Sequence, residues 1–433
     1  MDLHGNREIS MTVKKIMVLG IMVGCLGFLN AGDWPGWRGP GGDGVSQEKN
    51  IPTIWSKDKN IRWRLPVEGK GHSSPVIIGE KVFLTTCVEG KNERRLICVD
   101  KVKGAVIWDK LVLTSELEKK HSENSFASAT PAVDEKHIWV SFLDFPNARL
   151  FCFDHKGNKV WEQIPGKLLS RHGFCSSPVI HKDLVILNGD QDADGYLVAY
   201  EKTTGKEKWR VSRPNKTRSY CTPVLVKTEK NPNQTQLVLS GSKCVTGYDA
   251  DTGELLWIID GPTEQYVASL VFLEQILFLT TGFPEYHLMG IKPDGRGNVT
   301  KSHVAWHIPH KENGPKGASY VPSPIAHDGH FYVVSDVGYL GCIEAKTGKR
   351  LWMEKLGRKH HASPVYSDGN FYFTDDDGIT YVVKASPKFE LIAKNTMGES
   401  CYASPAISGG EMFLRTWNAL YCISEKTGTT ASK

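Results

Sequence analysis

The sequence predicts an all-β protein, an eight-bladed β-propeller of four-stranded antiparallel blades. Three observations predict this fold. A segment resembling "SSPVI" recurs eight times, a turn that ends in tryptophan recurs between these segments, and short β-forming apolar runs fill the intervals. A period of about 40 to 50 residues is typical of solenoids and propellers. Because such units cannot close their own hydrophobic faces, radial packing into a ring is the arrangement that protects most strand edges.

The first repeated element contains a proline, or in one degenerate copy a leucine, after a hydroxyl residue. In chain order this position is occupied by Pro75, Pro131, Pro178, Pro223, Leu270, Pro324, Pro364 and Pro405. The hydroxyl residues are Ser74, Thr130, Ser177, Thr222, Ser269, Ser323, Ser363 and Ser404. A catalytic serine is needed only once, so this recurrence indicates a hydroxyl that bonds to backbone.

The second repeated element is a small residue, an acid two positions later, a turn built on Thr-Gly or Lys-Gly, and a tryptophan. Complete copies end at Trp108, Trp161, Trp209, Trp257 and Trp352, and an interrupted copy ends at Trp306. Glycine supplies the positive φ that the turn requires. Alternating or β-branched runs such as "KVFLTTC" and "HFYVVSD" lie between the two elements, so each period holds about four strands, and no stretch has helical periodicity.

The closure of the ring can also be predicted. The chain ends after Pro405 without an outer tryptophan strand, whereas an unassigned strand, "NIRWRLPVEG", carries Trp63 before the first repeat. We therefore expect the strand around Trp63 to complete the last blade. The segment around Ile392 then becomes the outer strand of the seventh blade.

The domain organisation predicted is a signal peptide at 1–31, a leader arm at 32–60, a single propeller at 61–428 and a tail at 429–433. Lys14 and Lys15 precede an apolar run too short to span a bilayer, and Ala31 is the expected cleavage site. The mature protein is expected to be periplasmic or secreted, without a transmembrane segment. Lipid attachment at Cys25 is an alternative. The leader is expected to pack against the propeller, the alternative being a segment that docks a partner.

The charge of the chain excludes one class of partner. The net charge is +5, from 53 basic and 48 acidic residues, and no basic stripe is interleaved with aromatic residues. Nucleic acid is therefore not expected to bind. The expected partner is an envelope protein or a small polar or anionic ligand, and the expected state is a monomer.

The tryptophan element resembles the tryptophan-docking motif of PQQ-type (quinoprotein) propeller repeats, in exported bacterial PQQ-binding-like proteins. The resemblance covers Trp63 to about Gly428. It implies that the tryptophan of one blade stacks on the small first residue of a neighbour. Cysteines occupy that small position in four repeats, namely Cys98, Cys152, Cys342 and Cys422. Buried free thiols are therefore expected, with at least one disulfide as the alternative.

Functional residues are expected just before each Ser/Thr-Pro element, where they would surround one mouth of the central channel. The residues expected in this funnel are His72, Arg171, His172, Arg218, Tyr220, Tyr266, Tyr320, Lys359, His360, His361 and Tyr402. Such a set can hold an anionic or sugar-like ligand or the loop of a partner.

A metal site is the weaker hypothesis. Asp190, Asp192 and Asp194 match the start of a calcium loop, D-x-D-x-D-G followed by a Glu. The flanking segments are strand-like, so a plain hairpin with an acidic turn is favoured over calcium. No metal site is therefore expected.

Two functions remain open. The favoured one is an exported, non-catalytic binding or scaffolding platform without a cofactor, similar in architecture to the outer-membrane protein assembly propeller. The alternative is a PQQ- and calcium-dependent alcohol or sugar dehydrogenase with an atypical site, in which Trp417 and Asn418 contact the cofactor. The chain contains no adjacent cysteine pair and no "CxxCH" haem signature. No catalytic residue is therefore assigned.

Overall fold

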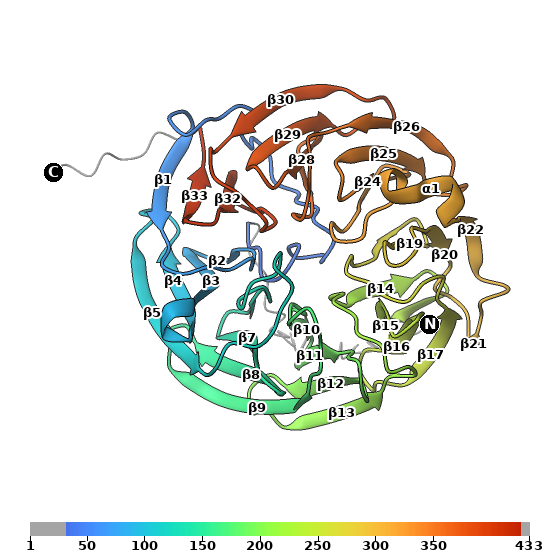
Figure 1. The fold of residues 1–433 in the computed structure, drawn as a ribbon, viewed down its shortest axis with the longest axis horizontal. Helices are drawn as coiled ribbons and strands as arrows, with labels where there is room; N and C mark the ends of the chain where they lie inside the picture. Colours follow the sequence, from blue (N-terminus) through green and yellow to red (C-terminus); the bar gives the residue numbers. More distant parts are fainter. Residues whose placement is uncertain (1–31, 426–433) are drawn as a thin grey trace, which may run out of the picture.

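Eight β-sheets are arranged around a central axis in the computed structural model, which describes residues 32–425 (Figure 1). Each sheet contains four consecutive antiparallel strands, except where noted below. The innermost strand of each blade begins one or two residues after the Ser/Thr-Pro element, and the outermost strand lies on the perimeter. The predicted eight-bladed propeller is confirmed.

The blades follow one another along the chain. Blade 1 comprises β2 (Val76–Ile78), β3 (Lys81–Val88), β4 (Glu93–Asp100) and β5 (Val106–Thr114). Blade 2 comprises β6 (Ala132–Val133), β7 (His137–Asp144), β8 (Asn147–Asp154) and β9 (Lys159–Lys167). Blade 3 comprises β10 (Val179–His181), β11 (Leu184–Gly189), β12 (Tyr196–Glu201) and β13 (Glu207–Ser212). Blade 4 comprises β14 (Val224–Thr228), β15 (Asn231–Gly241), β16 (Cys244–Asp249) and β17 (Leu255–Asp260).

The second half of the ring repeats this order. Blade 5 comprises β18 (Val271–Leu273), β19 (Ile276–Thr280), β20 (Leu288–Ile291) and β22 (Val304–Ile308). Blade 6 comprises β23 (Ile325–His327), β24 (His330–Val334), β25 (Tyr339–Glu344) and β26 (Arg350–Lys355). Blade 7 comprises β27 (Val365–Ser367), β28 (Asn370–Thr374), β29 (Ile379–Lys384) and β30 (Leu391–Thr396). Blade 8 comprises β31 (Ala406–Ser408), β32 (Glu411–Arg415), β33 (Ala419–Ile423) and β1 (Ile61–Pro66).

The ring closes as predicted, because β1 pairs antiparallel with β33 and places Trp63 opposite Cys422. Strands from the two ends of the described chain therefore share one sheet (Figure 1). The outer strand of blade 7 is β30, which contains Ile392. Both predictions about strand order are confirmed.

Three local features were not predicted. A two-residue strand, β21 (Gly297–Asn298), pairs in parallel with the outer strand of blade 4 and makes that sheet five-stranded. A short helix, α1 (His310–Gly317), follows blade 5 and is interrupted at Gly314 and Pro315. A 3₁₀ turn, η1 (Glu89–Lys91), joins β3 and β4. With eight residues and an internal proline, α1 is too short and irregular for helical periodicity to predict it.

The tryptophan motif joins neighbouring blades, although its geometry differs from the expected one. Trp108 lies opposite Cys98 of its own blade, and Trp257 lies opposite Gly247 of its own blade. The expectation that the small residue belongs to a neighbouring blade was therefore wrong. The neighbour contributes its Gly turn instead: a side chain at Gly104 would meet the ring of Trp63. The indole N–H reaches the same turn, as Trp63 donates to the carbonyl of Lys101 at 2.9 Å.

Four of the cysteines are buried spacers in this motif, namely Cys98, Cys152, Cys342 and Cys422. No disulfide joins any two of the nine cysteines in the described chain, and eight of the nine are buried. Burial raises the pKa of Cys98 to about 12 and that of Cys342 to about 12. Since the thiolate is the reactive form, these thiols are poor nucleophiles.

The eight hydroxyl residues form a chain of hydrogen bonds around the inner strands. The backbone N–H of Ser74 in blade 1 donates to the hydroxyl of Thr130 in blade 2 at 2.9 Å, and six further links of the same kind follow, ending at Ser404 in blade 8. The prediction that these hydroxyls bond to backbone is confirmed for seven of the eight. We call this set the hydroxyl ring.

Equivalent serines of the hydroxyl ring are expected to differ in their effect on stability. Ser177→Ala leaves the buried N–H of Thr130 without its acceptor, which costs about 1–3 kcal/mol. Ser74→Ala is expected to leave stability unchanged, because the buried hydroxyl of Ser74 has no partner among residues 32–425. Urea denaturation of both variants measures the difference. Equal losses in the free energy of unfolding would contradict the hydrogen bonds of the hydroxyl ring.

The leader arm packs against the propeller, as expected. Trp34 exchanges two backbone hydrogen bonds of 2.8 Å with Ile77 in blade 1, and Tyr366 in blade 7 accepts the N–H of Ser46. Trp34 and Arg38 are each only 1% exposed. Burial lowers the pKa of Arg38 to about 10. The leader thus links blades on both sides of the ring closure and contributes to the core.

The predicted signal peptide at 1–31, with Cys25, and the tail at 429–433 lie outside the described residues. Across residues 32–425, the structure contains no helix that is both long and apolar enough to cross a membrane.

Candidate functional site

A cavity of about 650 Å³ lies at one mouth of the central channel. It is lined by six members of the hydroxyl ring, namely Ser74, Ser177, Thr222, Ser323, Ser363 and Ser404, and by Trp37 of the leader. The other lining residues come mainly from the loops that enter the innermost strands, with Phe283, Tyr286 and Asp336 from loops between later strands of blades 5 and 6. The repeated residues therefore form part of the lining of this cavity, and residues that are not repeated form its walls.

Nine of the residues predicted for the funnel line this cavity. They are His72, Arg171, His172, Arg218, Tyr220, Tyr320, Lys359, His361 and Tyr402. The sequence argument missed a second set of lining residues, which includes His121, Glu123, Asn124, Gln265, Phe283, Tyr286 and Asp336. Three of these residues, His121, Glu123 and Asn124, lie between Pro75 and Pro131, the longest interval between repeats. The extra length of this interval was the feature of the sequence that could have indicated them.

The loop between blades 1 and 2 (residues 115–131) reaches the wall formed by blade 7. Glu123 forms an ion pair with Lys359, and its other carboxylate oxygen lies 3.3 Å from Nε2 of His361. Nδ1 of His361 lies 2.9 Å from the carboxylate of Asp376. A histidine held between two carboxylates and a neighbouring lysine thus connects two sides of the mouth.

A second polar group occupies the wall from blades 2 and 3. The rings of His121 and His172 lie 5.5 Å apart, and His172 lies 6.0 Å from Tyr220. Burial and the nearby guanidinium of Arg218 lower the pKa of His172. Arg218 is itself held by Asp192 at 2.6 Å. No ion pair to Arg171 is present within residues 32–425, so its charge is not neutralised by a carboxylate of the described chain.

The wall from blades 5 and 6 combines aromatic rings with hydrogen-bonding groups. Tyr320 donates to Oε1 of Gln265 at 3.2 Å, and its ring lies 6.4 Å from that of Phe283. Asp336 accepts the backbone N–H groups of Tyr320 at 2.7 Å and Val321 at 2.9 Å. Burial raises the pKa of Asp336 although these bonds oppose the shift.

The structure corrects the position of two predicted residues. His360 is fully buried and does not line the cavity, and its ring lies 6.3 Å from that of Tyr381. Because consecutive side chains of an extended segment point in opposite directions, Lys359 and His361 face the channel and His360 faces the interior. Tyr266 is also fully buried, and its hydroxyl donates to the carbonyl of Thr263.

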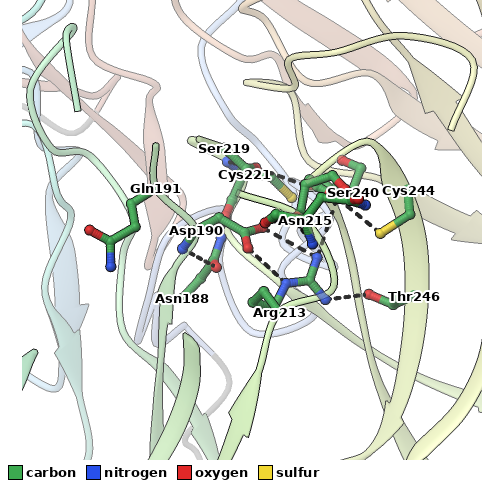
Figure 2. A network of polar contacts seen from close by, with 12 residues as sticks. Asn188, Asp190, Gln191, Arg213, Asn215, Ser219, Cys221, Ser240, Cys244 and Thr246 are labelled. Carbon is green, nitrogen blue, oxygen red and sulfur yellow. Dashed lines mark hydrogen bonds and ion pairs between the residues drawn. The ribbon is translucent and has the colours of Figure 1, made fainter. Parts of the chain in front are cut away.

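The acidic turn between β11 and β12 is a hairpin, as favoured, and its carboxylates do not converge. Asp190 pairs with Arg213 at 2.8 Å, Asp192 with Arg218, and Asp194 with Lys216 at 2.8 Å. Figure 2 shows the buried Arg213 directed at Asp190 and Thr246, between blades 3 and 4. Each carboxylate therefore has its own cation, and the weak calcium hypothesis for Asp190, Asp192 and Asp194 lacks a shared binding point.

The two residues named for the PQQ alternative, Trp417 and Asn418, make contacts outside the cavity. Trp417 does not line the cavity; its ring packs edge-on against Tyr402 at 5.6 Å, and Lys70 lies over it. The backbone carbonyl of Asn418 accepts the backbone N–H of Val67. Across residues 32–425 there is no group of three or more His, Cys, Asp or Glu side chains arranged to hold a metal ion. A calcium ion needs several oxygen ligands that converge.

The model of the family described as outer membrane protein assembly factor BamB matches residues 45–163, 92–276 and 299–388. No curated protein sequence matches the chain significantly.

Solved structures with the same fold include BamB and dehydrogenases. BamB from Moraxella catarrhalis is 10% identical, with a TM-score of 0.58 over 86% of this chain and 98% of that one. The quinohemoprotein alcohol dehydrogenase from Comamonas testosteroni is 13% identical, with a TM-score of 0.65 over 92% and 82%. A europium-containing methanol dehydrogenase is 12% identical, with a TM-score of 0.61 over 90% of each chain. At these identities the likeness shows the fold alone.

Proposed function

Because this chain belongs to the family of the outer membrane protein assembly factor BamB, we propose that it is an exported, non-catalytic propeller that binds a partner or ligand at its channel mouth. The observation that carries the proposal is the cavity of about 650 Å³. Its volume lies in the range of pockets that hold small ligands or the side chains of a partner loop.

The chemistry of the cavity supports binding over catalysis. Of the six hydroxyl-ring members that line it, five already accept a backbone N–H from the preceding blade, so they serve the ring. The walls carry tyrosines and the arginines Arg171 and Arg218, and Tyr and Arg are enriched among the residues that dominate binding at protein interfaces.

Photo-crosslinking tests the proposed function. A benzophenone amino acid replaces Tyr320 in the cavity wall, and the control replaces Ile164, an exposed residue of β9 on the outside of blade 2. In envelope extract of the source cells, we expect a discrete adduct from position 320 that excess unlabelled parent protein removes. Adducts only from position 164 would place the binding surface on the blade sides and would contradict the proposal.

The alternative reading is a PQQ-dependent alcohol or sugar dehydrogenase, and reconstitution separates it from binding. Purified protein is incubated with PQQ and calcium and assayed for dye reduction with alcohols and aldoses. We expect no reduction above that of a heat-denatured control, because Trp417 lies outside the cavity and the described residues offer no calcium site. Substrate-dependent reduction that Arg171→Ala abolishes would replace the binding proposal with the enzyme.

A further inference from the structure

The hydroxyl ring is open at one point, the junction between blades 8 and 1, which we call the seam. Seven of the eight links are formed, and the missing one would join the N–H of Ser404 to the hydroxyl of Ser74. Within residues 32–425, the Ser74 hydroxyl has no partner although Ser74 is only 1% exposed. No acceptor for the N–H of Ser404 exists in the same part of the chain. Both residues line the cavity.

Buried polar groups are rarely left without a partner, and each such group calls for an explanation. At the seven closed links, blade-to-blade contact supplies the partner. At the open link, Ser404, with its donor N–H, and Ser74, with its hydroxyl, line the same cavity from the neighbouring blades 8 and 1. An acceptor group of a ligand would complete both.

Positive charge surrounds this open link. After burial itself, the strongest influences on the pKa of His72 are repulsions from His361, Arg415, Lys120 and Lys70, and together these effects lower it to about 3. The guanidinium of Arg415, which is fully buried, donates to the carbonyl of Thr85 beneath the neighbouring Gly71. Positively charged side chains therefore lie near His72, and the lowered pKa of His72 means that this histidine does not itself carry charge near neutral pH.

The carboxylates near the seam are committed to other cations. Glu123 pairs with Lys359, Glu118 with Arg94 at 2.6 Å, and Glu399 with Arg64 at 2.9 Å. Asp376 contacts His361. In contrast, Lys70, Lys120 and Arg415 form no ion pair with any residue of the range 32–425. Three cations without a carboxylate partner in residues 32–425 thus act on His72, which lies two positions before Ser74 and lines the cavity.

Aromatic rings shape the space beside the open link. Tyr402 stacks on His361 at 4.5 Å and lies 4.9 Å from His72. All three rings line the cavity. They limit the approach to the seam to a small group that can reach between the rings, and a planar carboxylate or a phosphate meets this requirement.

We propose that the seam between blades 8 and 1 binds an oxyanion, a carboxylate or phosphate group, carried by the ligand or partner that enters the channel mouth. The oxyanion accepts the N–H of Ser404 and the hydroxyl of Ser74, and Lys70, Lys120 and Arg415 balance its charge. This inference rests on the proposed function, because it names the chemical class that the same cavity selects.

The test compares matched pairs of small probes by isothermal titration calorimetry at low ionic strength. Glutarate is compared with the neutral glutaramide, and phenyl phosphate with phenol. We expect at least one anion to bind and its neutral match to bind roughly tenfold more weakly or not at all, since hydrogen bonds to a charged group are the stronger ones. The preferred anion distinguishes a carboxylate from a phosphate. Equal binding within both pairs, or no binding of either anion, would overturn the proposal.

Two variants locate the bound anion. Ser74→Ala is expected to weaken anion binding roughly tenfold, whereas Ser269→Ala, which removes the equivalent hydroxyl at a closed link outside the cavity lining, is expected to leave it within about twofold. Lys120→Gln is expected to weaken binding several-fold and to reduce its dependence on salt, with Lys216→Gln as the control for loss of one charge. Unchanged affinity in Ser74→Ala and Lys120→Gln would place the anion elsewhere.

The outcomes separate this inference from the proposed function. A partner adduct at position 320 together with no anion binding would leave the channel mouth as the binding surface and overturn the oxyanion. Anion binding that Ser74→Ala weakens, without any adduct at position 320, would retain the seam site and contradict partner binding at the mouth.

Discussion

Arg213→Met is expected to lower the free energy of unfolding by about 3–5 kcal/mol, because it leaves the carboxylate of Asp190 buried without its cation. The side chains of both residues have no exposed area. Arg213 also donates to the hydroxyls of Thr246 at 2.8 Å and Tyr248 at 2.6 Å, so one substitution breaks contacts between blades 3 and 4 (Figure 2). Urea denaturation followed by tryptophan fluorescence measures the loss.

The same acidic turn supplies the control. Lys216→Met removes the partner of Asp194, but both side chains are largely exposed, so no change in Tm is expected. The double variant Asp190→Leu/Arg213→Met is expected to recover part of the stability, since it removes the buried charge together with its partner. A loss in Arg213→Met as small as that in Lys216→Met would contradict a buried ion pair.

The loss in Arg213→Met is expected to depend on pH. Burial raises the pKa of Asp190, and Arg213 opposes this shift in the parent protein. Without Arg213 the folded-state pKa rises further above the unfolded value of about 3.9. A raised folded-state pKa stabilises the protein below the unfolded pKa, and that stability is lost as pH rises through the folded pKa. The deficit of the variant is therefore expected to be smallest near pH 4 and to grow toward neutral pH.

Trp34→Ala is expected to cost about 3–5 kcal/mol, the loss typical of a large aromatic side chain removed from a core. Trp34 belongs to the core cluster that contains Ile77 and Phe413, and its ring covers Gly39. Trp34→Phe is expected to cost less, because it keeps most of the apolar area and removes an indole N–H that has no partner in the described chain.

Trp37 is the matched control for Trp34, since it lies three positions later in the same leader. It is only partly buried and lines the cavity, so Trp37→Ala is expected to change stability little. Thermal unfolding of the three variants tests both statements. A small loss in Trp34→Ala would show that the leader contributes little to the fold.

Much of the candidate site could be predicted because repetition separates residues that build the ring from those that do not. The position before each Ser/Thr-Pro element indicated nine of the lining residues. Glu123 and His121 could not be found in this way, since they lie in a long loop with no counterpart in other repeats. Their place in the mouth depends on Glu123 reaching Lys359, which is 236 positions away in the chain.

His360 shows the limit of arguing from position alone. It lies between two residues that face the channel, yet it points into the protein. Which side chain of such a run faces the cavity depends on where the strand begins, and a shift by one residue exchanges the two sides. The acidic turn shows the same limit. The spacing of its three carboxylates could be read from the sequence, but the three cations that pair with them could not.

The sequence by itself determined the number of blades, the order of the strands and the closure by β1, because each depends on local patterns that recur with one period. Only the tertiary structure decided how blades meet: the tryptophan over the next blade's turn, the buried Arg213, and the one open link of the hydroxyl ring at Ser74. The physical reason is that a contact between blades depends on side chains far apart in the chain. The repeated elements at the seam are the same as those at the seven closed junctions, so no repeat could have predicted the open link.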